Sequence, residues 1–429
     1  MAKTRLPFAD RMFRTVLCCL VLYLSFRYPL QINFSGTSPT YSDTPPLLQA
    51  GKYLIALGFC TLVLITSRMR LPNQDVSLVL LGSMFIAMTC VVKFAISGEF
   101  RFIEPILWPS LAAILCLHAT RLETATIEKY ILRLFTFALV TDVVQVTLFL
   151  AIDRLPALAY EDSISVRFGS FLDDPNGFSG LCFLFIGWAI GARPSWRTSV
   201  VFWGSILMIL LAQSLTSIGF LVLVLLVVGK HRAKASPVKA GILAAITSVP
   251  LLYFSTDLIE IFNAVLEYKQ GSISTHTKHG LLDILPNGAT QFLFGSNSFT
   301  FYESWWNLSL SNFGVLWSAP FMILGTYTSF RLFKEYSASQ DEERRAVFCA
   351  LLVFSLFFMF GSFNLPLFVI FPNSFIFYCI AFMSLGRKIQ TLVPITQTPE
   401  PGAARKRPRL KTATTTTARA PRLPGTDPA

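Results

Sequence analysis

Long apolar runs alternate with short polar connections along most of the chain. Each run is about long enough for one helix to cross the hydrocarbon core of a bilayer, and open strands cannot span lipid because their backbone groups would lack partners. The pattern therefore predicts an all-α, polytopic integral membrane protein with about twelve transmembrane helices. The predicted spans are residues 11–31, 47–66, 75–96, 103–119, 129–151, 177–192, 198–213, 217–229, 239–255, 305–329, 346–364 and 367–386.

The composition fits a membrane protein and excludes an ordinary soluble enzyme. Of the 429 residues, 53% are hydrophobic and only 14% are charged, whereas about a quarter of the residues of a soluble domain are charged. The eight cysteines all fall inside or beside apolar runs, where cysteine acts as a small hydrophobic residue. No disulfide framework or metal-ligand spacing is visible. We predict neither a metal nor any other cofactor.

The positions of lysine and arginine indicate which connections face the cytoplasm, because positively charged short loops are retained on that side. Both termini are expected there. The net charge of +12 comes mostly from these residues and the tail, so no nucleic-acid partner is expected. Basic residues gather before the first run, in every second connection and in the tail, at 3–14, 68–70, 121–133, 193–197, 230–239, 331–345 and from Arg387 onward.

The stretch 198–229 is long enough for one tilted helix or for two short ones. Basic residues precede it at Arg193 and Arg197 and follow it at Lys230, so both of its ends are predicted to be cytoplasmic and the stretch to be a hairpin. The two longest polar connections, 152–176 and 256–304, then both lie outside the cytoplasm. This asymmetry indicates chemistry on the outer face of the membrane.

Two domains are expected. Residues 1–392 form the transmembrane domain, and its first span, although it follows basic residues as in a signal peptide, lacks a small-residue cleavage site and is expected to remain as an anchor. Residues 393–429 are rich in Pro, Thr, Ala and Arg. Because such a composition cannot bury a core, we expect a disordered, basic cytoplasmic tail that rests on anionic lipid.

One polar, turn-rich segment leads directly into an apolar run. It extends from Arg167 to Gly177 and reads RFGSFLDDPNG. The segment resembles the R-x-G-x-F-x-D-P-N pattern of the O-antigen ligase and polymerase family, bacterial membrane proteins that join lipid-linked glycans on the outer side of the inner membrane. The remaining helices resemble the family only in topology.

The resemblance implies that Arg167 binds the diphosphate of a substrate, since a planar guanidinium donates two parallel hydrogen bonds to phosphate oxygens. The alternative is an interfacial arginine that anchors a helix to headgroups. Asp173 and Asp174 precede Pro175, an arrangement that also caps a helix. At least one of the two is expected to be a cap, and the pair could instead hold Mg²⁺ against a diphosphate. Asn176 is expected to shape the loop.

The second outer connection continues the resemblance. Members of the family carry a basic residue, usually arginine, before an L-F-G-x-G turn, and later an E-S-x-x-L helix entrance. This chain has Lys278, then LFGS at 293–296, then Glu303. Lys278 is therefore expected to be a second phosphate ligand, although lysine offers a point charge where the family pattern has a bidentate fork.

Three side chains in this connection are candidates for the base that deprotonates an attacking hydroxyl. Glu303, flanked by Trp305 and Trp306, could act in a poorly solvated pocket, or could only complement a helix dipole. His276 and His279 could transfer a proton near neutral pH or be incidental loop residues. The two tryptophans fit an interfacial aromatic belt, and equally a stacking surface for a sugar.

Asp142 lies in the middle of an apolar run, where an ionisable side chain is costly enough to indicate a purpose. Lys93 is its expected partner, in a structural pair or in a substrate contact, and Gln145 would suit either. Arg101, near the outer edge, is a phosphate ligand or a headgroup anchor. The segment at Ser217 resembles the family's T-x-S-R-G pattern without its arginine, and we expect only a structural role for it.

Together the motifs predict a polysaccharide polymerase, a glycosyltransferase that acts on undecaprenyl-diphosphate-linked oligosaccharide. The product would be O-antigen, capsule or an exopolysaccharide of the xanthan kind, and a chain-length-regulating co-polymerase is a partner such an enzyme could have. A ligase to lipid A core would share the architecture, but ligases of the family tend to have histidine at the Glu303 helix entrance. A flippase is the alternative from another class, because Asp142 and Lys93 would suit a transporter.

Overall fold

The computed structural model describes residues 74–118, 122–152, 159–161, 166–172, 174–233, 288–300, 302, 304–363, 365, 367–368, 373–385 and 389–390, together with Gly51, Leu54, Gly58, Thr61 and Ile65. By its contacts the chain divides into Met1–Thr391 and Leu392–Ala429, and every described residue belongs to the first unit. The predicted spans 11–31 and 239–255, most of 47–66 and the basic tail lie outside the described residues.

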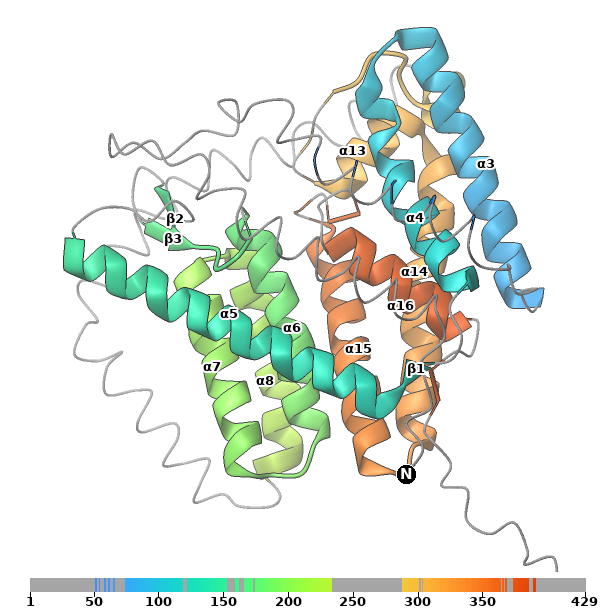
Figure 1. Ribbon diagram of the computed structural model, residues 1–429. Helices are drawn as coiled ribbons and strands as arrows, with labels where there is room; N and C mark the ends of the chain where they lie inside the picture. The colour runs from blue at the N-terminus through green and yellow to red at the C-terminus, as the bar shows by residue number, and fades with distance from the viewer. Residues whose placement is uncertain are drawn as a thin grey trace, which may run out of the picture. The chain divides into compact units, whose positions relative to one another are not determined.

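The described part of the chain is mostly helical, as predicted (Figure 1). Helices α3 to α8, α15 and α16 each occupy one predicted apolar run. The α-helices are α3 (Gln74–Ser97), α4 (Glu104–His118), α5 (Thr124–Ile152), α6 (Pro175–Gly191), α7 (Trp196–Ala212), α8 (Leu215–Ala233), α12 (Ala289–Phe294), α13 (Trp305–Phe313), α14 (Val315–Ala338), α15 (Glu342–Gly361) and α16 (Asn373–Leu385), and a 3-10 turn, η3, spans Phe100–Phe102.

Two helices, not one, occupy the stretch 198–229. Helix α7 ends at Ala212, Gln213 takes a left-handed conformation with φ 49°, and α8 begins at Leu215. Because a left-handed residue cannot continue an α-helix, the chain must break there. The prediction that this stretch holds two helices is confirmed.

The run 305–329, predicted as one helix, is two. Gly314 separates α13 from α14 with φ +77°, and Gly295 after α12 has φ +74°. A Cβ on Gly314 would collide with the backbone of Leu293, and one on Gly295 would collide with the backbone of Asn312. The two glycines thus let the α12 turn and the α13–α14 junction pack backbone against backbone. The apolar pattern continues through this break, so it gave no sign of it.

Two short sheets, which the sequence analysis did not predict, accompany the helices. Strand β1 (Leu122–Glu123) pairs in parallel with β4 (Ile389–Gln390), and β2 (Ala159–Glu161) pairs antiparallel with β3 (Val166–Phe168). In the second sheet Tyr160 lies opposite Arg167. Strands of two or three residues are too short to show a period-two pattern. The β2–β3 pair matters because it fixes the backbone from which Arg167 projects.

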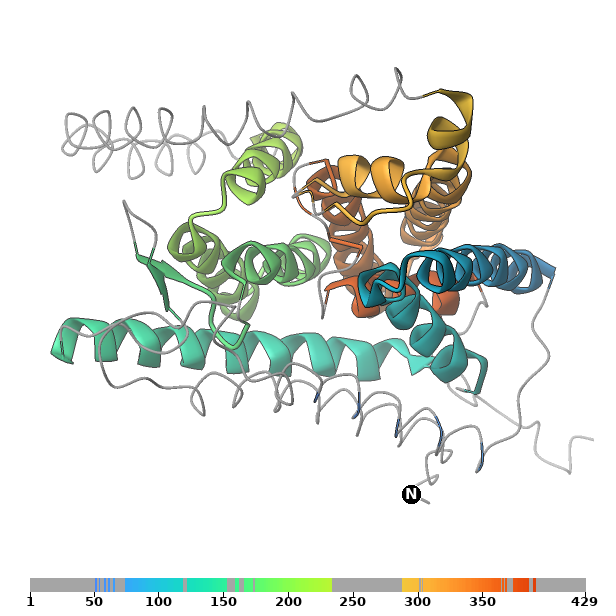
Figure 2. The ribbon, with the colours of Figure 1, turned by 90° about the horizontal axis from the view of Figure 1, so that it is seen from above.

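Helices α6 and α15 form the most closely packed pair in the described part of the chain (Figures 1 and 2). A Cβ on Gly187 would lie 2.7 Å from the Cα of Ala350, and one on Gly191 would lie 2.8 Å from the Cα of Ala346. Small residues on both faces therefore let the two backbones approach, as at many helix interfaces in membranes. This contact holds α6, whose first turn carries the candidate site, at the centre of its neighbours.

Three connections predicted to be cytoplasmic meet at one end of this helix group. Arg193, after α6, forms an ion pair with Glu342 at the start of α15, and the hydroxyl of Thr124 at the start of α5 donates 2.8 Å to Glu343. The connections before α5, after α6 and before α15 therefore lie at the same end of this helix group. The Arg167 segment precedes α6 and therefore lies at the opposite end of that helix from Arg193. The last residues of α15 likewise lie at the opposite end of their helix from Glu342.

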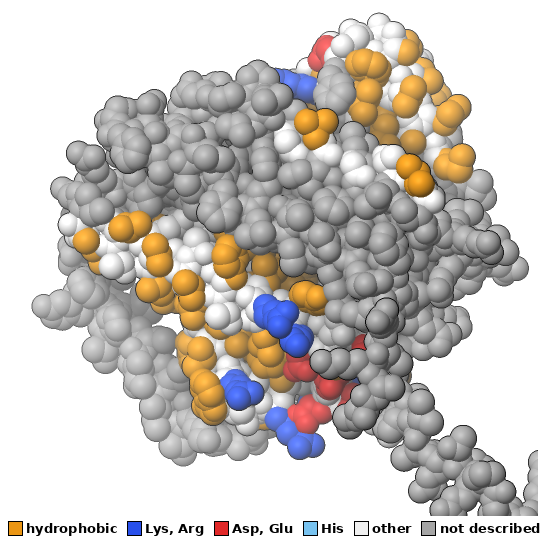
Figure 3. Space-filling model, viewed as in Figure 1, with side chains coloured by type: hydrophobic (Ala, Val, Ile, Leu, Met, Phe, Trp, Pro, Cys, Tyr) orange, Lys and Arg blue, Asp and Glu red, His pale blue; other side chains and the backbone are white. Residues whose placement is uncertain are grey.

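Two helices of the described residues are long and apolar enough to cross a membrane. They are Thr124–Leu148 of α5 and Glu342–Gly361 of α15. Helix α5 leaves a row of apolar side chains exposed, with Val140 at 56%, Val143 at 55% and Val144 at 49% of their full surface. Figure 3 shows such apolar side chains spread over this face of the molecule. The predicted number of about twelve spans goes beyond this finding.

Candidate functional site

The segment 166–177 folds as a strand, a tight turn and a helix start. Strand β3 ends at Phe168, the N–H of Leu172 donates 2.9 Å to the carbonyl of Gly169, and Ser170 takes φ 54°. Pro175 is the first residue of α6, where its missing N–H costs nothing. Asp174 is the N-cap, as predicted for one of the two aspartates, and its carboxylate accepts hydrogen bonds of 3.0 Å from the N–H groups of Asn176 and Gly177. Asp173 lies outside the described residues.

Arg167 is buried, with 8% of its surface exposed, and its guanidinium is held in one orientation. Its Nε donates 3.0 Å to the carbonyl of Ala212 at the end of α7, and one terminal nitrogen donates 2.7 Å to Oδ1 of Asn176 in the first turn of α6. A headgroup anchor extends to the surface, so this burial argues against the anchoring interpretation, and two of the guanidinium nitrogens already donate to protein oxygens. The two contacts place a cation beside the N-terminus of α6, where a helix attracts anions.

A row of hydroxyl groups continues from this point between α6 and α8. The Ser179 hydroxyl donates 2.8 Å to the carbonyl of Asn176 and lies 2.6 Å from the hydroxyl of Ser217, which in turn lies 3.2 Å from that of Ser214. All three serines are buried. Ser217 therefore ties the start of α8 to the first turn of α6.

Gln145 and Ser170 fasten the turn after Arg167 to α5. The Gln145 amide donates 2.6 Å to the Ser170 carbonyl, and the Ser170 hydroxyl donates 2.9 Å to the carbonyl of Ala138. Asp142, one turn before Gln145, is 1% exposed. Its carboxylate faces the backbone of Ser170, and neither carboxyl oxygen has a side-chain hydrogen-bond partner among the described residues.

The predicted pairing of Lys93 with Asp142 is wrong. The Lys93 ammonium donates 2.5 Å to the carbonyl of Ser296 and lies 5.9 Å from the centre of the Phe102 ring. Lys93 thus joins α3 to the LFGS turn, far along the chain from α5. The reason is topological, since α3 packs on α4, α14 and α16 rather than on α5.

The LFGS turn and the α13–α14 junction form a second ordered region. Gly295 packs against the backbone of Asn312, just before the α13–α14 junction at Gly314. The Ser296 N–H donates 2.6 Å to the carbonyl of Ser311. The amide of Asn312 bonds both the N–H and the carbonyl of Thr300, at 2.8 and 2.7 Å. The LFGS turn and the end of α13 are therefore one packed unit.

Trp305 is a core residue and offers no exposed surface for a sugar. It is fully buried, its ring stacks on Phe368 at 4.9 Å and 27°, and it contacts Trp317 at 5.3 Å. This corrects the expectation of an interfacial or sugar-stacking role for Trp305. Trp306 is partly exposed and lies 5.7 Å from Phe363, so it alone of the pair retains an accessible edge. Arg101, in η3, is exposed, as both of its interpretations require.

Asn373 is a site residue that sequence reasoning missed. It is 1% exposed, lies at the start of α16, and its amide donates 2.7 Å to the carbonyl of Gly177. The end of α15 also contacts the second region, because the Trp305 N–H donates 3.2 Å to the Ser362 carbonyl. The α15–α16 connection therefore touches both motif regions. A signal was present, since Pro372-Asn373-Ser374 repeats the Pro-Asn-small pattern of Pro175-Asn176-Gly177.

The structure thus brings together Arg167, Asp174 and Asn176 and adds Ala212 and Asn373. His276, Lys278, His279 and Glu303 lie outside the described residues, so their placement relative to Arg167 stays a prediction. Among the described residues no group of three or more His, Cys, Asp or Glu side chains could hold a metal ion. Comparison of the chain with protein-family models gives no match, and comparison with curated proteins gives none either.

Proposed function

We propose that this protein is an integral membrane glycosyltransferase that polymerises polyprenyl-diphosphate-linked oligosaccharide repeat units on the extracytoplasmic face of the bacterial inner membrane, for exopolysaccharide or O-antigen synthesis. The observation that carries the proposal is the placement of Arg167. Its buried guanidinium is held by Asn176 and Ala212 at the N-terminus of α6, within the segment that resembles the O-antigen ligase and polymerase family.

The membrane location is supported by three features of the described residues. Helices α5 and α15 are long and apolar enough to cross a bilayer. Apolar side chains lie exposed along α3, α5, α7, α8 and α14, as expected where lipid replaces water around a protein. The basic connections gather at one end of the helix group, which then faces the cytoplasm. Arg167 lies at the other end, where a lipid-linked sugar would be met after its transfer across the membrane.

The proposed reaction joins one lipid-linked glycan to another. A hydroxyl of the acceptor unit attacks the anomeric carbon of the donor, a new glycosidic C–O bond forms, and the bond between that carbon and the diphosphate breaks. The diphosphate leaves with the bonding electron pair, and Arg167 and Lys278 stabilise its charge. The proton of the attacking hydroxyl passes to Glu303, His276 or His279.

Asp174 is assigned to positioning in this proposal. Both of its carboxylate oxygens accept N–H bonds from the first turn of α6. These bonds fix the start of α6 and hence Asn176, the partner of Arg167. Mg²⁺ needs carboxylate oxygens turned toward the ligand, and those of Asp174 are turned to the helix backbone instead.

One observation favours a second candidate, a flippase for the same lipid-linked oligosaccharide. Asp142 is buried inside α5 without a side-chain hydrogen-bond partner among the described residues, and such residues in membrane spans often belong to transport pathways. A ligase to lipid A core is the third candidate and differs only in its acceptor.

The three candidates are separated by reconstitution. The purified protein is placed in liposomes with a polyprenyl-diphosphate-linked repeat unit and no nucleotide sugar, with and without lipid A core, beside liposomes that carry Arg167→Ala. A polymerase produces a ladder of longer lipid-linked glycans without lipid A core, and the variant does not. Product only when lipid A core is added makes the protein a ligase. Movement of the intact unit across the bilayer with no change in size makes it a flippase, and either result overturns the proposal.

A further inference from the structure

A hollow of about 610 Å³ lies along α5. Its volume falls within the range of about 300–1,000 Å³ that small-molecule sites occupy. Lys129, Arg133, Thr136, Phe137 and Val140 are among the residues that line it. One end borders the candidate site, because Phe137, which lines the hollow, packs on Phe171 with ring centroids 5.2 Å apart. Lys129 precedes Ala138, whose carbonyl accepts the Ser170 hydroxyl, by nine residues, so the basic end of the hollow is roughly 14 Å along the helix axis from the Arg167 turn.

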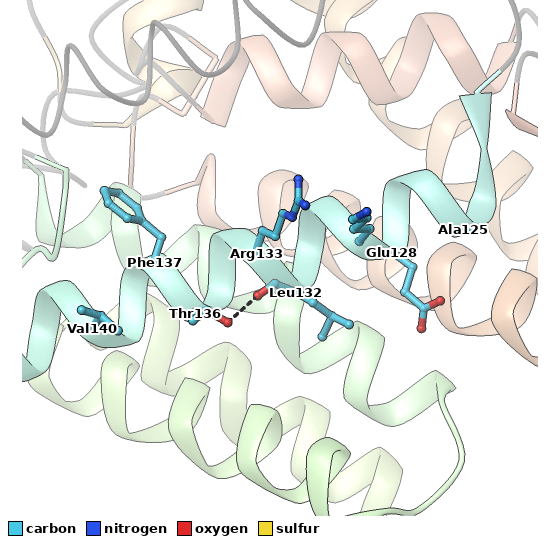
Figure 4. A pocket seen from close by; sticks show the side chains of 8 residues that line it. Ala125, Glu128, Leu132, Arg133, Thr136, Phe137 and Val140 are labelled. Carbon is cyan, nitrogen blue, oxygen red and sulfur yellow. Dashed lines mark hydrogen bonds between the residues drawn. The ribbon is translucent and has the colours of Figure 1, made fainter. Parts of the chain in front are cut away.

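The hollow has a cationic end and an apolar end. Lys129 and Arg133, one turn apart and both exposed, lie on the same face of α5, and Thr136 and Val140 continue that face. Beyond the hollow the face is apolar, with Val143, Val144 and Leu148 exposed. Figure 4 shows the labelled side chains along α5, with Arg133 and Phe137 projecting from the same side of the helix.

The two cations are not neutralised by the protein residues that the structure describes. Neither Lys129 nor Arg133 has an ion pair or hydrogen bond of its side chain among the described residues. Glu128 also lines the hollow, and its carboxylate accepts a 3.0 Å hydrogen bond from the indole N–H of Trp188. With Glu128 ionised, the three charged side chains of the lining carry a net charge of +1. Like charges one turn apart on a helix repel each other, so an anion held between them would relieve that repulsion.

We propose that this hollow binds one anionic phospholipid, with its phosphate between Lys129 and Arg133 and an acyl chain along Phe137 and Val140. The charge pattern decides the occupant, because a zwitterionic lipid would bring its own cation to the basic end and a soluble anion would leave the apolar end uncovered. Since Lys129 and Arg133 belong to a connection predicted to be cytoplasmic, the lipid belongs to the inner leaflet. The proposal rests on the membrane location proposed above and not on the polymerase reaction.

The site would be tested by native mass spectrometry of the full-length protein released from detergent, titrated with phosphatidylglycerol and, separately, with phosphatidylcholine. The variant Lys129→Gln/Arg133→Gln removes both cations. A matched control, Arg197→Gln/Lys334→Gln, removes two exposed cations of other predicted cytoplasmic connections. Since each basic residue near an anionic lipid contributes about a fivefold gain in affinity, the first variant is expected to bind phosphatidylglycerol about 30-fold more weakly.

The expected result is a preference of the wild type for phosphatidylglycerol that falls in Lys129→Gln/Arg133→Gln and persists in the control. Equal losses in both variants would mean diffuse attraction to a basic surface, and no loss in either would mean that another part of the chain or another ligand fills the hollow. Each of these outcomes overturns the proposal. Fractionation of cells that express the wild type gives a separate readout, because recovery outside the membrane fraction would remove the membrane location itself. Neither lipid binding nor fractionation depends on polymerase activity, so a failure of the proposed polymerase function would leave both results unchanged.

Discussion

Arg167 donates a 2.7 Å hydrogen bond from its guanidinium to Oδ1 of Asn176. The bond joins the first and the tenth residue of the RFGSFLDDPNG segment, so the motif closes on itself around the N-terminus of α6. Because Asp174 caps the same turn, the capping and the cation-holding residues of the motif form one unit. The spacing of Arg167, Asp174 and Asn176 along the chain therefore follows from the geometry of this one unit.

A substitution at Asn176 tests whether the position of the Arg167 guanidinium matters, because it leaves the charge of Arg167 in place. Asn176→Ala removes the acceptor and should lower the rate of glycan transfer by about 10- to 100-fold, since a catalytic group displaced by about 1 Å can cost that much. The rate is measured from the decay of the lipid-linked repeat unit in liposomes. Asn297→Ala, at an exposed asparagine of the 288–300 segment, is the control and should keep the wild-type rate. A wild-type rate in Asn176→Ala would show that this contact does not position Arg167 for the reaction.

Two substitutions at Asp174 distinguish a role in helix capping from a role in metal binding. Asp174→Ala loses both acceptor oxygens and should lower the free energy of unfolding by about 1 kcal/mol, whereas Asp174→Asn should keep most of it because asparagine is an equally good cap. Thermal unfolding in detergent measures both. If Asp174→Asn is as stable as the wild type and inactive, the negative charge matters and the capping assignment is incomplete.

The α6–α15 contact predicts opposite responses to the same substitution at two glycines. Gly187→Ala places a methyl group 2.7 Å from the Cα of Ala350 and should destabilise the protein by about 1–3 kcal/mol through overpacking. Gly219→Ala in α8 meets nothing within 4 Å and should stabilise it by up to about 1 kcal/mol. Unfolding midpoints of the two variants check this, and a tolerated Gly187→Ala would mean that α6 and α15 are not so close.

Lys93 and Asp142 are expected to act independently. Lys93→Met removes the contact with Ser296 and Asp142→Asn changes a group near Ser170, and the two share no partner. Their effects on the free energy of unfolding should therefore add within about 0.5 kcal/mol. A double-mutant cycle measures this. A larger interaction term would restore the pairing that the sequence suggested.

Local patterns predicted much of the described fold. Apolar runs located α3 to α8, α15 and α16 because a helix that faces lipid or other helices needs apolar residues over its whole length. The break between α7 and α8 followed from the charges that flank the stretch. The N-cap at Asp174 followed from the Asp-Pro pair, since capping depends only on neighbouring residues.

Features that depend on distant residues could not be predicted in the same way. The break at Gly314 exists because Leu293 packs against it, and the burial of Trp305 depends on Phe368 and Trp317. Lys93 was given the wrong partner because an apolar pattern does not say which helices are neighbours. Asn373 was missed for the same reason, since its contact with Gly177 spans most of the chain.

The central claim, that Arg167 binds the leaving diphosphate, is tested most directly by Arg167→Lys in liposomes supplied with the lipid-linked repeat unit. Lysine keeps the charge but loses the planar fork and cannot reproduce both contacts, to Ala212 and to Asn176. We predict that the transfer rate of Arg167→Lys falls by about 100-fold or more at a temperature where the variant is still folded. Arg197→Lys, an exposed control, should keep the wild-type rate. A wild-type rate and an unchanged ladder in Arg167→Lys would contradict the account.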